Sequence, residues 1–271
     1  MAFKLGFATE QTENKVSKNT TTEQHSQVVP RKSVVQVYFA DENRSLAYYN
    51  DKFDLHQGDL VFVDGKLEGK RGRITDVSYS FKIKVSDYQR VIAVADTNVK
   101  GQFFMSGSHF ITFDRVALPR EKAITWFKAP PKDDDEFVCG TDDDKFCLDR
   151  ISDMEVSEAV AKRGHCYYVE NRVRYISIDG NKGYAVVMGG EAYEVDFEYH
   201  NGEISHLSCT CFCTYRCKHE FATMIQLKET LELISKYYED EYENSGYFAA
   251  VAKDTMLALA IDGKEKGSFT L

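Results

Sequence analysis

Short runs that alternate apolar and polar residues fill the chain between residues 33 and 130. The runs SVVQVYFA, DLVFVDG and RVIAVADT are rich in β-branched and aromatic residues, and turn-forming residues separate them. Because side chains alternate between the two faces of a strand, these runs predict a small all-β unit over 33–130. The preceding Thr-, Gln- and Asn-rich stretch has few large apolar residues, so we expect a flexible tail over 1–32.

The pattern changes after residue 130. A polar stretch with two Asp triplets predicts an acidic linker over 131–150. A helix is expected next, with Ser152 as its N-cap, Glu155 completing a capping box and Gly164 at its end. Three strand-like runs follow, and the pair Asn201-Gly202 predicts a hairpin turn that leads into EISHLSCTC.

The segment after Cys217 carries apolar residues at helical spacing, which predicts an amphipathic helix that begins near His219. The last segment, 246–271, predicts a second helix and a short terminal strand. The expected fold class is therefore α+β, with a barrel-like all-β unit followed by a hairpin and helices over 151–271. The residues of the amphipathic stripe are Phe221, Met224, Ile225, Leu231, Ile234 and Tyr238.

Composition places the 271-residue chain among ordinary globular proteins, with 43% hydrophobic and 28% charged residues. Its N-terminus turns polar too soon for a secretory signal, and no apolar run approaches the ~18 residues that span a bilayer. These features predict a cytoplasmic protein that does not contact membranes. In a compartment that keeps thiols reduced, clustered cysteines indicate a metal site before they indicate disulfides.

The net charge of -9 argues against indiscriminate nucleic-acid binding, because phosphate neutralisation supplies most non-specific affinity. The segment 31–130 nevertheless has 16 Lys and Arg against 12 Asp and Glu. Its glycine-punctuated stretch GDLVFVDGKLEGKRGRITDV resembles the KOW and SH3-like barrels of transcription and translation proteins. Within that stretch the basic side chains are candidates for phosphate contacts, and a solvated hairpin loop is the alternative. They are Lys66, Lys70, Arg71 and Arg73.

Four of the seven cysteines and one histidine fall within the stretch CTCFCTYRCKHE. Cys209 and Cys211 would lie at the end of a hairpin strand, whereas Cys217 and His219 would lie at the start of a helix. A structural zinc ion takes four thiolate or imidazole ligands in a tetrahedron, and two such pairs can supply them. Since four protein ligands leave no open coordination position, the pattern predicts a structural zinc site.

The pattern CxCx(n)CxH, preceded by a hairpin and followed by a helix, resembles the SWIM zinc finger. The upstream stretch RGHCYYVENRVRYISIDGNKGYAVVMGGEAYEVDFEY is similar to the lead-in of that family. The resemblance implies that Cys209, Cys211, Cys217 and His219 are the zinc ligands. It also implies an accessory module that contacts DNA or other proteins. No catalytic core accompanies the finger, so we expect a non-enzymatic nucleic-acid binding module, with a protein-interaction adaptor as the alternative.

Other interpretations of the cluster remain open from the sequence. Cys213 forms a second CxC pair with Cys211 and would be a ligand in place of Cys209. The cysteines would otherwise be unligated in a buried turn. A nucleophilic pair, Cys217 or Cys166 with His219 or His165 as its base, lacks an orienting carboxylate motif. The sequence also has no phosphate-binding glycine loop and gives no sign of a small-molecule substrate.

Overall fold

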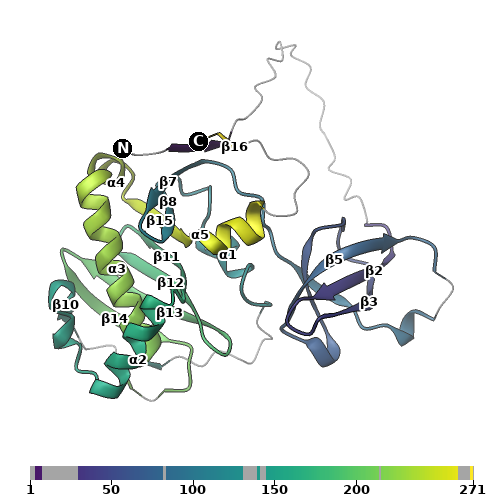
Figure 1. The fold of residues 1–271 in the computed structure, drawn as a ribbon, viewed down its shortest axis with the longest axis horizontal. Helices are drawn as coiled ribbons and strands as arrows, with labels where there is room; N and C mark the ends of the chain where they lie inside the picture. The colour runs from purple at the N-terminus through teal and green to yellow at the C-terminus, as the bar shows by residue number, and fades with distance from the viewer. Residues whose placement is uncertain are drawn as a thin grey trace, which may run out of the picture. The chain divides into compact units, whose positions relative to one another are not determined.

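The computed structural model describes residues 30–81, 84–130, 145–213 and 215–261. It also describes the backbone of three short strands, β1 (Lys4–Phe7), β9 (Cys139–Gly140) and β16 (Phe269–Thr270). The chain divides into two compact units, one of residues Phe7–Ala95 and the other of Met1–Gly6 with Asp96–Leu271. Each unit is built on an antiparallel sheet, and the helices make the whole a mixed α/β protein (Figure 1).

The unit Phe7–Ala95 contains a five-stranded sheet in the order β3-β2-β5-β4-β6. Alternate residues of β2 point into a common core, where Val35 and Val37 are fully buried beside Ile74 of β5. The outer strand β3 meets the start of β6 at one bridge, because the Tyr49 N–H donates to the Gln89 carbonyl at 2.9 Å. The strands are β2 (Ser33–Phe39), β3 (Arg44–Asn50), β4 (Leu60–Val63), β5 (Arg71–Ser78) and β6 (Val91–Val94), with short 3-10 turns η1 (Gly65–Leu67) and η2 (Val85–Asp87).

The larger unit contains an eleven-stranded sheet in the order β10-β14-β13-β12-β11-β15-β8-β7-β1-β16, with β9 paired to β14. The Asn201-Gly202 turn joins β13 to β14, and both residues have positive φ, so the predicted hairpin is confirmed. The remaining strands are β7 (Gln102–Ser106), β8 (His109–Thr112), β10 (Phe146–Cys147), β11 (Val173–Asp179), β12 (Lys182–Met188), β13 (Ala192–His200), β14 (Glu203–Cys209) and β15 (Tyr247–Ala252).

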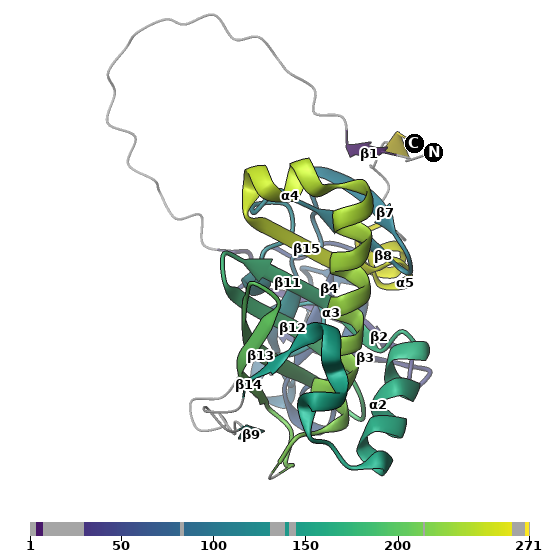
Figure 2. The same cartoon turned by 90° about the vertical axis from the view of Figure 1, so that its left-hand side faces the viewer.

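The helix α3 crosses one face of strands β11 to β14, and α2 packs against α3 (Figure 2). Between α3 and the sheet lie the apolar side chains of one face, including Ile176, Val187 and Val195. On the opposite face the buried Tyr175 hydroxyl donates to the Leu118 carbonyl at 2.9 Å. The helical segments are α1 (Arg120–Ile124), η3 (Leu148–Met154), α2 (Glu158–Val169), α3 (Lys218–Tyr237), α4 (Glu239–Ser245), α5 (Lys253–Met256) and the π-helix η4 (Leu257–Ile261).

The boundary between the units differs from the expected one at residue 130. Strand β8 pairs with β15, with Ile111 opposite Ala250, so residues 96–130 belong to the larger unit. Alternation along a strand shows which side chains are buried but not which strand is its partner. Most of the expected tail, 1–32, and of the expected linker, 131–150, lies outside the described residues. The described end of that linker forms β10 and the start of η3.

Two helix predictions were wrong in detail. Helix α2 begins after Ser157, whose side chain accepts the Val160 N–H at 3.3 Å, and it continues to Val169, five residues beyond Gly164. Where a helix was expected to begin after residue 246, the structure has the strand β15, and a helical segment starts only at Lys253. All six residues of β15 are buried, and an apolar run buried on both faces has no period that distinguishes strand from helix.

Gly183 leaves room for a ring on the neighbouring strand. It lies opposite Phe197 in the pairing of β12 with β13, and a methyl group there would be 2.0 Å from the Phe197 ring. The ring is only 3% exposed and packs in the core under α3, so it has no free space to enter.

We expect Gly183→Ala to lower the free energy of unfolding by about 1–3 kcal/mol, as overpacking does in other cores. Urea titration followed by circular dichroism measures this change. Gly190→Ala is the matched control, because no atom lies within 4 Å of an added methyl group there. The control should change the stability by less than ~0.5 kcal/mol. Equal stabilities of the two variants would contradict the packing described for Phe197.

His109 joins β8 to β11 through its side chain. Its Nε2 lies 2.8 Å from the Val173 carbonyl, which can only accept, and its Nδ1 lies 2.9 Å from the Ser108 hydroxyl. Nε2 therefore carries a proton, and in the neutral imidazole Nδ1 accepts from the Ser108 hydroxyl. Burial lowers the pKa of His109 from 6.5 to about 4.

A buried neutral histidine makes stability depend on pH. Between about pH 6.5 and 4 the unfolded state binds a proton that the folded state does not bind, so stability falls as the pH decreases through this window. The loss reaches about 3 kcal/mol at pH 4. We expect the difference in unfolding free energy between wild type and His109→Gln to change by this amount across the window, as measured by urea titration. A difference that stays constant with pH would contradict the neutral state.

Candidate metal centre

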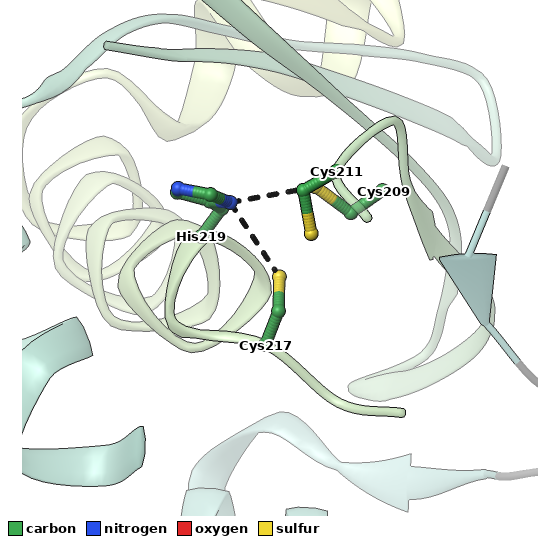
Figure 3. Close-up of side chains that lie close together, drawn as sticks. All are labelled: Cys209, Cys211, Cys217 and His219. Carbon is green, nitrogen blue, oxygen red and sulfur yellow. Dashed lines mark hydrogen bonds between the residues drawn. The ribbon is translucent and has the colours of Figure 1, made fainter. Parts of the chain in front are cut away.

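Four buried side chains converge where the hairpin ends and α3 begins. Their ligand atoms, three sulfurs and one imidazole nitrogen, all lie within 4.8 Å of one another (Figure 3). His219 Nδ1 is 3.7 Å from the sulfur of Cys209 and 3.7 Å from that of Cys217. Such a group could hold a metal ion. We call these residues the ligand cluster: Cys209, Cys211, Cys217 and His219.

The sheet fixes the first half of the cluster. Cys209 is the last residue of β14 and lies opposite Val195 of β13. One residue further, the Thr210 hydroxyl accepts the Glu194 N–H at 2.9 Å, and the Thr210 N–H donates to the Glu194 carbonyl at 3.0 Å. The chain that leads to Cys211 is therefore held against β13 before it turns away.

The first turn of α3 fixes the second half. Cys217 is the N-cap, and its sulfur accepts the Glu220 N–H at 3.4 Å. In return the Glu220 carboxylate accepts the Cys217 N–H at 2.7 Å, which completes a capping box. His219 lies in the first turn of the same helix. The helix start thus sets the positions of both ligands through its own backbone bonds.

Two tyrosines orient the imidazole. The Tyr193 ring stacks on His219 with centroids 4.2 Å apart and an interplanar angle of 16°, while the Tyr167 ring lies 5.4 Å away at a tilt. Nδ1 faces the sulfurs, and Nε2 is buried with no hydrogen-bond partner in the described part of the chain. The sequence did not reveal these roles, although both tyrosines belong to the lead-in that resembles the SWIM family.

The thiols share protons in the space where a cation would lie. Hydrogen bonds from the Cys209 and Cys217 thiols hold the pKa of Cys211 well below its ordinary value. Hydrogen bonds with Cys209 and Cys211, together with burial, raise the pKa of Cys217. The protonation of these side chains is therefore coupled, and a bound cation would compete with their protons.

A buried acid and a buried base lie beside the cluster. Burial raises the pKa of Glu220 to about 7, while the Cys217 N–H and the Arg216 charge act in the opposite direction. Arg216 is 6% exposed, and its guanidinium lies 5.8 Å from the centre of the Phe146 ring. These two side chains provide charges of both signs near a group of thiols that a cation would ionise.

The structure brings the four predicted ligands together and leaves Cys213 exposed. Cys213 stays close to the cluster, because a hydrogen bond with the Cys211 side chain adds to burial in raising its pKa. The alternative nucleophilic residues His165 and Cys166 are exposed on α2. No carboxylate orients His219 among the described residues, since its Nε2 lacks a partner.

The predicted phosphate contacts lie in the other unit, along η1 and β5. Lys66 and Arg71 are exposed. Lys70 forms an ion pair with Glu42, and Arg73 donates to the Gly58 carbonyl at 3.0 Å. Both Lys70 and Arg73 therefore already have partners within the protein.

We expect the purified chain to bind one divalent metal ion and each ligand variant to lose it, because the remaining three side chains leave the tetrahedron open. The variants are Cys209→Ser, Cys211→Ser, Cys217→Ser and His219→Ala. Cobalt substitution followed by absorption spectroscopy measures binding and reports the number of thiolate ligands. Cys213→Ser is the matched control and should retain the ion. Loss of the ion in that control, together with its retention in Cys209→Ser, would show that Cys213 is a ligand and Cys209 is not.

No family model matches the sequence, no curated protein matches it, and no solved structure matches it. Among the described residues no helix is long and apolar enough to cross a membrane. The ligand cluster is thus interpreted from its own geometry.

Proposed function

We propose that the ligand cluster binds a structural zinc ion in a SWIM-type arrangement and that the chain is a nucleic-acid binding module without its own catalytic core. One observation carries the proposal: four buried metal-ligand atoms, from a strand end and a helix start, lie within 4.8 Å of one another. The identity of the metal is inferred from the ligand atoms, and the class of partner is inferred from charge and from the resemblance to SWIM fingers.

The donor set favours zinc. Three thiolates and a neutral imidazole suit Zn²⁺ and do not suit Mg²⁺ or Ca²⁺, which prefer oxygen ligands. A tetrahedral zinc ion with bonds of ~2.3 Å to sulfur and ~2.0 Å to nitrogen separates these ligands by about 3.5 Å. The distances of 3.7 Å from His219 Nδ1 to two sulfurs come close to that value. Four protein ligands would fill the coordination shell, which supports a structural role.

A zinc ion at this place would join α3 to the hairpin. Cys209 belongs to β14, whereas Cys217 and His219 belong to the start of α3, so the ion would link two separate elements of the unit. Apolar residues of α3 such as Met224 and Leu227 already bury themselves against the sheet. The ion would fix the N-terminal end of α3, where polar groups replace the apolar contact with the sheet.

The partner class rests on charge and on the resemblance to SWIM fingers. Residues 31–130 carry a surplus of positive charge in an acidic chain, and the exposed Lys66 and Arg71 are part of it. Phosphate contacts of this kind supply affinity that falls steeply with salt. The alternative, a protein-interaction adaptor, is favoured by the acidic first turn of α4, which contains Glu239, Asp240 and Glu241.

If the basic side chains contact phosphates, removing them will weaken the salt dependence of binding. We expect the combined change Lys66→Ala, Lys70→Ala, Arg71→Ala and Arg73→Ala to reduce the slope of log K against log salt by about 1 for each phosphate that the variant no longer neutralises. Fluorescence anisotropy with labelled DNA and RNA measures the slope, and elemental analysis of the same samples identifies the metal.

The pair Lys52→Ala and Lys84→Ala is a control, since both lysines are exposed in the same unit but outside the basic stretch. Its slope should equal that of wild type. Absence of wild-type binding at about 50 mM salt, a condition that favours phosphate contacts, would exclude the nucleic-acid function and leave the adaptor.

A further inference from the structure

Two aromatic side chains are exposed beside the ligand cluster. Phe212 is 84% exposed and Tyr215 is 46% exposed, although most large apolar residues of the described chain are buried. Both lie on the metal loop, which we define as the described residues 210–213 and 215–216. Phe212 directly follows Cys211, and Tyr215 comes two residues before Cys217.

The metal loop is anchored at both ends. Its first residue is bound to Glu194 of β13 by two hydrogen bonds, and its last residue precedes the N-cap of α3. A short segment held at both ends has little conformational entropy left to lose when it binds a partner. The exposed rings contribute little to the apolar core of their own unit. Their placement is therefore suited to a contact with another molecule.

The short stretch that contains the metal loop has a positive charge in an acidic protein. The stretch from Cys209 to His219 contains two basic residues and no acidic one, whereas the chain has a net charge of -9. The Lys218 ammonium and the Arg172 guanidinium each lie 4.8 Å from the centre of the Tyr167 ring, which is adjacent to His219. Arg172 also pairs with Glu170 at 2.5 Å, so Lys218 is the side chain that places a positive charge next to the ligand cluster.

Helix α2 adds to this charge. Gly164 of α2 brings the two helices into close contact, since a methyl group there would be 2.9 Å from the Lys218 carbonyl. The neighbouring Lys162 and Arg163 are exposed. The basic side chains of α2 and of the first turn of α3 therefore belong to the same end of the helix pair, where the metal loop also lies.

We propose that Phe212 and Tyr215 are a stacking platform for unpaired bases of a single-stranded nucleic acid and that Lys218 and the basic residues of α2 contact its phosphates. This inference rests on the proposed nucleic-acid function and specifies the form of the ligand. Aromatic rings stack on bases that are unstacked from their neighbours, which a duplex does not offer without melting. The local positive charge favours a nucleic acid over a protein as the partner.

The test uses the zinc-loaded full chain and a fluorescein-labelled 12-nucleotide single strand of mixed sequence, with the matching duplex as the comparison. We expect wild type to prefer the single strand. The double change Phe212→Ala and Tyr215→Ala should weaken its binding by about 10- to 100-fold, because each stacked base contributes an appreciable share of the affinity. Phe212→Trp should retain binding. Lys218→Ala should reduce the salt slope by about 0.7.

Tyr237→Ala is the matched control, since Tyr237 is 56% exposed at the other end of α3 and should not affect binding. Zinc content is measured for every variant, and Phe212→Ala alone decides the outcome if the double variant loses zinc. Unchanged binding by the loop variant, or equal affinity for the duplex, would overturn the platform and leave the nucleic-acid function intact. Failure of zinc-loaded wild type to bind either form would overturn both proposals and indicate a protein as the partner of the loop.

Discussion

The convergence of three cysteines and one histidine between β14 and α3 is the constraint on which the larger unit is arranged. Cys209 is fixed by the pairing of β14 with β13, while Cys217 is fixed by the capping box of α3. The position of α3 over the sheet must satisfy both anchors at once. Three thiols buried together gain little from packing, so a metal ion that ionises and neutralises them gives the arrangement its physical reason.

Apolar burial and the ligand cluster act at different points along α3. The middle of the helix buries Met224, Leu227 and Ile234 against the sheet, which fixes its lateral position. Its first turn is polar, with Glu220 and Thr223 fully buried. Without a metal ion, the carboxylate of Glu220 and the thiols of the ligand cluster would be polar groups buried at that end of the helix. At the start of α3 the contact with the sheet is made by the ring of Tyr193 and the ligand cluster, whereas further along the helix it is made by apolar side chains.

Local patterns were enough to predict the hairpin at Asn201-Gly202, the helix that begins next to His219 and the four residues of the ligand cluster. Each of these depends on residues within a few positions of one another, where spacing and backbone preference decide the structure. The failures concern distant partners. Nothing in the sequence of β8 shows that β15, more than a hundred residues later, lies beside it. The sequence also favoured Ser152 as the N-cap of α2, whereas the N-cap in the structure is Ser157.

A structural metal at the start of α3 would also link folding to binding. Under the proposed function, the loop that presents Phe212 and Tyr215 is bounded by ligands of the ion, so a bound ion would help to hold its shape. A partner that binds this shape, and not the metal-free chain, stabilises the metal-bound state by an amount set by its concentration relative to its dissociation constant. By the same linkage the metal affinity must rise when the partner is bound. A site classed as structural because its coordination shell is full would in this way still take part in recognition.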